Sequence, residues 1–193
     1  MKKSLGANTL IYPTPTWIVG TYDKTGRPNA MTIAWGGICC SQPPCLAVSL
    51  RKATYSHGNI VERKAFTVSV PSVAQIKEAD YFGIVSGRKI DKLAVTGLTA
   101  TKAEFVDAPY VEECSLVLEC RLLHTIEIGL HTQFIGEIMD VKADEAVLAA
   151  DGLPDMDKVQ PFVFAPGPRA YYKVGDLVGK GFAAGKEFMK DEG

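Results

Sequence analysis

The chain has 193 residues, of which 47% are apolar and 22% charged, and its 21 basic and 22 acidic side chains leave a formal net charge of −1. This balance excludes the broad basic surface of a protein that binds nucleic acid or an anionic membrane. The length suits one domain, residues 1–193, with a sizeable core. No apolar stretch approaches the ~18 residues of a membrane span, and no apolar segment of a signal peptide follows Lys2 and Lys3. We therefore expect a cytoplasmic protein.

Short runs rich in apolar and β-branched residues occur along most of the chain and predict strands. The first two lie within residues 17–38, where a turn-forming segment at residues 23–28 indicates a hairpin. Alternating or apolar runs predict further strands at residues 45–50, 65–70, 113–124, 132–141, 160–164 and 170–174.

The predicted helices are few and short. They lie at residues 56–62, at residues 73–81 after Ser72 as the N-cap, and at residues 144–150. Six or more strands joined by short helices favour a closed or partly closed β-barrel. A Rossmann fold is excluded because the chain lacks both a βαβ rhythm and a Gly-x-Gly-x-x-Gly segment opening a helix.

The pattern of the five cysteines indicates side chains that pack in the core rather than a disulfide framework or a metal site. Their odd number and the absence of Cys-x-x-Cys argue against a disulfide framework and a zinc ribbon, and an iron–sulfur cluster lacks a fourth ligand at a known spacing. We expect all five to act as small buried hydrophobes, with a redox role as the alternative: Cys39, Cys40, Cys45, Cys114 and Cys120. The three histidines are far apart in sequence and predict no metal site.

Residues 29–35 read Asn-Ala-Met-Thr-Ile-Ala-Trp and predict a strand with one face of small side chains. On an alternating strand Ala30, Thr32 and Ala34 share that face. A flat heteroaromatic ring needs such a close approach, with backbone N–H groups and the Thr32 hydroxyl as donors. The alternative is a strand whose small face packs under a helix.

The segment that follows the predicted strand at residues 45–50 is rich in cations and hydroxyls. Arg51, Lys52, Thr54, Ser56 and His57 lie within seven residues, where a strand leads into a predicted helix. A phosphate monoester binds to such cations, to hydroxyl groups and to the free N–H groups of a helix start. The segment therefore predicts a phosphate site, with a solvated polar loop as the alternative.

Two later segments are weaker candidates. Residues 86–92 again place cations beside a glycine, so this segment could cover a pocket, reach a second subunit or form a surface turn. His131 stands at the start of a predicted strand, where it is either structural or a hydrogen-bond partner of a bound ring. The chain has no Gly-x-Ser-x-Gly segment and no nucleophile with an orienting base, which argues against hydrolytic chemistry.

Five motifs in this order resemble those of the flavin reductase-like, FMN-binding split-barrel family, over roughly residues 8 to 175. Each motif is loose by itself, but the five in sequence are specific. They are Asn-Ala-Met-Thr-x-Ala-Trp, Ser-Leu-Arg-Lys-x-Thr-x-Ser, Phe-Thr-Val-Ser-Val-Pro, Ser-Gly-x-Lys-x-Asp-Lys and His-Thr-x-Phe-Ile-Gly-Glu-Ile.

The resemblance implies a split β-barrel homodimer with one FMN per subunit near the subunit interface. It places Asn29, Ala30, Met31, Thr32 and Trp35 along the isoalloxazine and ribityl groups. It assigns the phosphate to Arg51, Lys52, Thr54 and Ser56. It brings Ser86 and Lys92 to the cofactor and His131 near the ring.

One departure bears on function. Flavin reductases of this family commonly have Gly-Asp-His before the late strand, whereas this chain has Gly129, Leu130 and His131. Without that carboxylate, a role for NAD(P)H is less favoured than redox cycling of bound FMN with transfer of electrons to a protein partner. The alternatives are an NAD(P)H:flavin oxidoreductase that supplies reduced flavin and a flavin-binding barrel without redox turnover.

Overall fold

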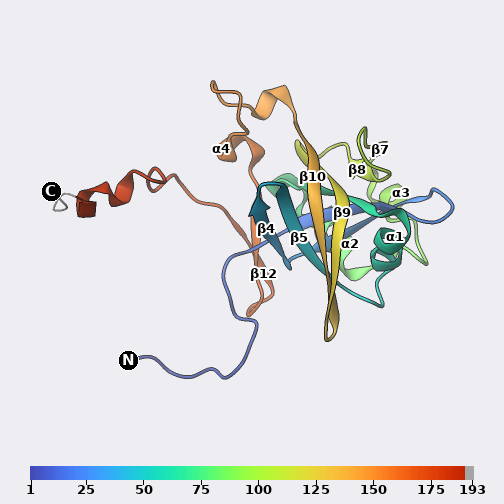
Figure 1. Ribbon diagram of the computed structural model, residues 1–193, viewed down its shortest axis with the longest axis horizontal. Helices are drawn as coiled ribbons and strands as arrows, with labels where there is room; N and C mark the ends of the chain where they lie inside the picture. The colour runs from blue at the N-terminus through green and yellow to red at the C-terminus, as the bar shows by residue number, and fades with distance from the viewer. Residues whose placement is uncertain (190–193) are drawn as a thin grey trace.

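A seven-stranded antiparallel sheet curves into a barrel in this computed structural model, which describes residues 1–189 apart from the side chain of residue 187 (Figure 1). The strand order is β3-β2-β6-β9-β10-β5-β4. The strands are β2 (Trp17–Tyr22), β3 (Pro28–Ile33), β4 (Gly36–Ser41), β5 (Pro44–Arg51), β6 (Ala65–Val70), β9 (Leu116–Ile128) and β10 (His131–Ala143). The predicted mainly β class is confirmed, and the fold is a split barrel.

Smaller elements flank the barrel. A three-stranded sheet has the order β1-β11-β12, and β7 pairs with β8. Their bounds are β1 (Thr14–Pro15), β7 (Ala100–Lys102), β8 (Pro109–Val111), β11 (Phe162–Ala165) and β12 (Ala170–Lys173). The helices are α1 (Tyr55–Arg63), α2 (Ile76–Ile84), α3 (Lys92–Thr96) and α4 (Met156–Val159), with 3-10 turns η1 (Val73–Gln75), η2 (Glu145–Val147) and η3 (Ala184–Met189). None of the helices in the described part is long and apolar enough to cross a membrane.

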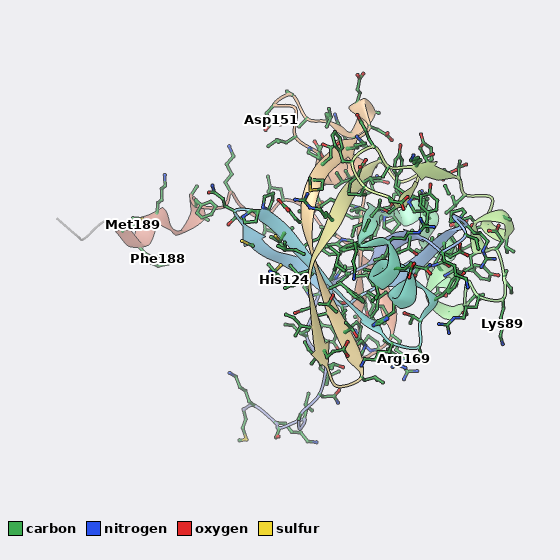
Figure 2. All side chains as sticks on the ribbon, turned by 45° about the vertical axis from the view of Figure 1, so that its right-hand side comes forward. Lys89, His124, Asp151, Arg169, Phe188 and Met189 are labelled. Carbon is green, nitrogen blue, oxygen red and sulfur yellow. The ribbon has the colours of Figure 1, made fainter. Side chains whose placement is uncertain are left out.

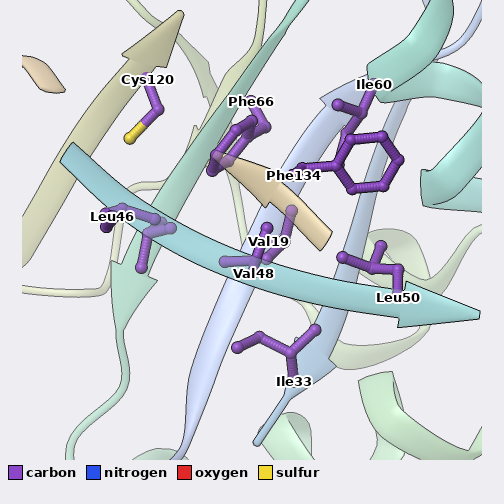
Figure 3. Close-up of a cluster of buried hydrophobic side chains, with 10 residues drawn as sticks. Val19, Ile33, Leu46, Val48, Leu50, Ile60, Phe66, Cys120 and Phe134 are labelled. Atoms are coloured by element: carbon purple, nitrogen blue, oxygen red, sulfur yellow. The ribbon is translucent and has the colours of Figure 1, made fainter. Parts of the chain in front are cut away.

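The barrel is filled by one cluster of buried apolar side chains (Figure 3). Burial of each large member contributes about 1.5–3 kcal/mol. Phe66 lies so close to β10 that a Cβ atom on Gly136 would stand 2.6 Å from its ring, so glycine is required there. The cluster comprises Val19, Ile33, Leu46, Val48, Leu50, Ile60, Phe66, Val68, Cys120 and Phe134.

A second cluster joins α2 to the outside of β3. Ala30 is 2% exposed and packs there with Ala79 and Phe82 of α2. The Thr32 hydroxyl donates a hydrogen bond of 2.5 Å to the carbonyl oxygen of Ala79. The small face of β3 therefore packs under a helix, which is the alternative that the sequence left open.

The predicted strand over residues 29–38 is interrupted at residues 34 and 35. β3 ends at Ile33, and β4 starts at Gly36 and pairs with β5 instead of β2. Gly36 passes close to the indole of Trp17, where a Cβ atom would stand 2.8 Å from the ring. The predicted helix at residues 144–150 is also wrong, since only the 3-10 turn η2 forms there.

The cysteines follow the prediction in part. Cys45, Cys114 and Cys120 are buried, whereas Cys39 and Cys40 are exposed, so the expectation of five buried thiols is wrong for two of them. The reason is the position of β4 at the edge of the sheet, where one side of the strand has no neighbour in the sheet.

Candidate functional site

Two adjoining cavities form one cleft beside β3, β5 and the end of α2. The larger has a volume of about 580 Å³ and the smaller about 290 Å³. Both are within or close to the range of about 300–1,000 Å³ for small-molecule sites. They are continuous because they share five lining residues: Met31, Arg51, Thr54, Gly83 and Ile84.

The larger cavity has an aromatic wall. The rings of Trp35 and His131 are nearly parallel, at 8°, with their centroids 6.4 Å apart. Trp35 lies in the connection between β3 and β4, and His131 begins β10 directly opposite Arg51 on β5. The pairing of β5 with β10 thus brings a cation and the aromatic wall together at one end of the barrel.

The smaller cavity lies at the start of α1. Thr54 is the N-cap, and its hydroxyl donates to the carbonyl oxygen of Arg51 at 2.9 Å, which holds the turn from β5 into the helix. The first turn of α1 contains no acidic residue. The first N–H groups of a helix lack intrahelical partners and carry partial positive charge. This part of the cleft is therefore suited to an anion.

Lys92 adds a buried cation to the smaller cavity. Its side chain is 4% exposed, and its ammonium donates to the carbonyl oxygen of Phe82 at 3.0 Å. Among the described residues, no carboxylate forms an ion pair with it. Burial lowers the pKa of Lys92 to about 8. An anion in the cavity would reverse this shift, because it favours the charged form.

Asn29 presents an unsatisfied acceptor in the same cavity. Its amide nitrogen donates to the Ser56 hydroxyl at 2.8 Å, but its buried Oδ1 atom has no hydrogen-bond partner. Gly87 lies so close to this oxygen that a Cβ atom there would overlap it. Buried oxygens in native proteins are nearly always satisfied, so a ligand that brings a hydroxyl donor fits here.

The loop before α3 packs against the start of α1. Arg27 donates to the carbonyl oxygen of Gly87 at 2.6 Å, and Arg88 donates to that of Ala53 at 3.1 Å. Both guanidinium groups lie 5.7 Å from the centre of the Tyr55 ring. The loop at residues 86–89 therefore covers the smaller cavity, one of the roles that the sequence allowed.

Most of the predicted site residues are brought together. Those that line the cleft are Asn29, Met31, Thr32, Trp35, Arg51, Thr54, Ser56, Ser86, Lys92 and His131. Two lie elsewhere: Ala30 is packed under α2, and Lys52 points outward and forms an ion pair of 2.5 Å with Glu127. Contact of the ten residues with a flavin stays a prediction.

Sequence reasoning missed one wall of the cleft. This wall comes from α2, from the three-stranded sheet and from residues next to its strands: Thr16, Asp80, Gly83, Ile84, Phe164, Arg169 and Tyr171. The Tyr171 hydroxyl donates to Asp80 at 2.9 Å and so ties β12 to α2. Arg169 follows Pro-Gly-Pro in the turn before β12 (Figure 2). A cation in such a turn is the one sequence feature that could have indicated this wall of the cleft.

Comparison with known proteins agrees with this geometry. Residues 9–170 match the family described as flavin reductase like domain. The chain belongs to this family. A solved flavoredoxin of Desulfovibrio vulgaris (Miyazaki F) is 61% identical, with 96% of this chain and 100% of that chain covered and a TM-score of 0.93.

Two further relatives are informative. The flavoredoxin structure from Methanosarcina acetivorans is 34% identical, covers 98% of this chain and 100% of its own, and has a TM-score of 0.92. The high molecular weight rubredoxin of Moorella thermoacetica is 32% identical over 102 residues, which are 52% of this chain and 43% of that protein. Together with the family, they support a flavin-binding redox protein.

Lys92 should make the stability of the flavin-free protein depend on pH. Its folded pKa of about 8 lies below the ordinary value of 10.5, so between these values the unfolded chain binds more protons and stability rises with pH. From about pH 7 to about pH 10.5, the free energy of unfolding should rise by about 2–3 kcal/mol more than in Lys92→Met. Urea denaturation across this range measures it, and parallel pH profiles would contradict the assignment.

Proposed function

We propose that the protein is an FMN-binding electron-transfer flavoprotein that exchanges electrons with a redox protein partner. The observation that carries this proposal is the cleft itself, in which an anion site at a helix start opens into a larger cavity with an aromatic wall. The similarity to the two flavoredoxins supports it.

The residues of the smaller cavity fit the phosphate end of FMN. Arg51, Lys92 and the first N–H groups of α1 would hold the phosphate, with Thr54 beside them. The free Oδ1 atom of Asn29 would accept a hydrogen bond from a ribityl hydroxyl. FMN specificity follows from this arrangement, because riboflavin lacks the phosphate.

The residues of the larger cavity fit the ring end. Met31 and Thr32 line it from β3, and Trp35 and His131 line it from the β3–β4 connection and the start of β10. Since the Thr32 hydroxyl already donates to Ala79, it positions α2 rather than donating to the ring. The bound flavin supplies reversible electron transfer, and charge near its ring tunes its potential.

The mouth of the cleft favours a protein partner over a nicotinamide donor. Trp35 and Ile84, which line the larger cavity, are exposed by 39% and 74%, and Leu130, next to the lining residue His131, by 63%. Exposed apolar residues around a site are typical of a protein-binding surface. Leu130 also stands where flavin reductases of the family commonly have a carboxylate, so NAD(P)H:flavin oxidoreductase activity is the second candidate.

We also propose a homodimer, and the exposed apolar side chains of the C-terminal segment support it. The segment after β12 runs away from the barrel, with Phe188 and Met189 at its far end (Figures 1 and 2). Val178 and Phe182 are fully exposed, and Leu177 is 80% exposed. Apolar side chains in this number are unfavourable in water, and a second copy of the chain would bury them.

Replacement of Arg51 by alanine should weaken FMN binding about 10- to 100-fold, the range for loss of a charge-assisted hydrogen bond, while riboflavin binding changes little. Flavin fluorescence titration of the flavin-free protein measures both affinities. Lys52→Ala is the matched control, because Lys52 points outward to Glu127 and should leave both affinities unchanged. Equal losses for FMN and riboflavin in the Arg51 variant would show that the phosphate lies elsewhere.

Under anaerobic conditions, NADH should leave the visible flavin spectrum of the FMN-loaded protein in its oxidised form, whereas dithionite should bleach it. The reason is the missing carboxylate at Leu130. Rapid bleaching by NADH or NADPH would identify the protein as a flavin reductase. A protein that dithionite cannot bleach would support the non-catalytic alternative.

Light scattering of the full chain should give twice the chain mass of 20.8 kDa. Removal of residues 175–193 should weaken this association, because it removes the exposed apolar side chains of the C-terminal segment. A full chain that stays monomeric at high concentration would contradict the dimer, without bearing on FMN binding.

A further inference from the structure

The hairpin of β4 and β5 places two thiols directly opposite each other at the end of the barrel remote from Arg51. Cys40 and Cys45 are Cα partners in the register, and only Ser41, Pro44 and a two-residue turn lie between them. The Ser49 amide donates to Trp35 ahead of β4, so the backbone groups of every second residue of β5, Cys45 among them, point toward β4. Cys40 and Cys45 therefore form a hydrogen-bonded pair, the kind whose Cα atoms lie about 5.5 Å apart. This separation lies within the range of about 4.4–6.8 Å that a disulfide requires.

The two thiols differ in accessibility. Cys40 is exposed on the edge strand, and its sulfur lies 3.4 Å from the carbonyl oxygen of Gln42, over the turn. Cys45 is 3% exposed. Burial, with smaller contributions from Cys40, Cys39 and Glu137, raises the pKa of Cys45. An oxidant in solution therefore meets Cys40 first, and Cys45 is placed to react second.

The remaining cysteines are poorer partners. Cys39 is exposed as well, but the register shift between Ile38 and Cys40 leaves it without a Cα partner on β5. Cys114 and Cys120 are buried, and burial raises the pKa of each thiol. Cys39 thus provides a matched control, since it is next to Cys40, also exposed and outside the cross-strand pair.

We propose that Cys40 and Cys45 form a reversible cross-strand disulfide by exchange with a low-molecular-weight disulfide. The Cys40 thiolate attacks one sulfur of that disulfide, and one thiol leaves as the mixed disulfide forms. The Cys45 thiol then loses its proton and attacks the Cys40 sulfur, which releases the second thiol. The protein loses two electrons and two protons, and the small disulfide becomes two thiols.

The disulfide would fasten the edge of the barrel to the strand that carries Arg51. β4 begins next to Trp35, and the Ser49 amide on β5 donates to the Trp35 carbonyl oxygen at 2.8 Å. Closing the far end of this hairpin limits the opening of β4, the only edge strand on that side of the described sheet. The oxidised protein should therefore unfold at a higher temperature than the reduced protein.

The experiment compares the full-length FMN-loaded protein with Cys39→Ser and Cys40→Ser after incubation with oxidised glutathione. Free thiols are counted after denaturation, and intact masses are recorded without reductant. The wild-type protein and Cys39→Ser should each lose two thiols and two hydrogen atoms, with no retained glutathione. Cys40→Ser should form no intramolecular disulfide.

Three results would overturn the proposal. They are an intramolecular disulfide in Cys40→Ser, its absence in Cys39→Ser, and a wild-type protein that ends only as glutathione adducts or as disulfide-linked dimers. Thermal unfolding of the reduced variants shows that each is folded, and both substitutions are at exposed positions. None of these results depends on whether the partner of the flavin is a protein or a nicotinamide.

Discussion

The site depends on positive charge gathered at the start of α1, where no carboxylate of the described residues forms an ion pair with Arg51 or Lys92. The turn from β5 into the helix places Arg51 beside free N–H groups, and Lys92, the first residue of α3, lines the same cavity. Burial lowers the pKa of Lys92, and Asn29, whose Oδ1 atom has no hydrogen-bond partner, lines the same cavity. Such an arrangement is unfavourable when empty and is relieved by an anion that also carries hydroxyl groups.

The barrel supplies the rigidity that this site needs. The end of β5 and the start of β10 are paired residue by residue, so Arg51 and His131 are fixed by backbone hydrogen bonds. The fully buried Phe66 and Phe134 fill the space behind these strands. A cleft whose walls are strands and helix ends can hold a ligand with little reorganisation, which lowers the entropic cost of binding.

Local patterns sufficed to predict much of the fold and the cluster of polar residues at the start of α1. The alternation in residues 65–70 predicts β6 with its observed bounds. The segment rich in cations and hydroxyls after β5 indicates the start of α1, because its polar side chains lie within a few consecutive residues. The sequence could not show which face of β3 meets the cleft, since an alternating strand allows Ala30 either to contact a bound ring or to pack under a helix. The outward direction of Lys52 depends on Glu127 in β9, and Arg169 and Tyr171 reach the cleft from a separate sheet. Such long-range contacts leave no signal in a local pattern.

A crystal structure of the protein with FMN tests the central claim most directly. We predict density for the phosphate within hydrogen-bond distance of the first N–H groups of α1 and of the Arg51 guanidinium, with the ring in the larger cavity beside Trp35 and His131. A phosphate bound at another place, with the start of α1 left to solvent, would contradict the account.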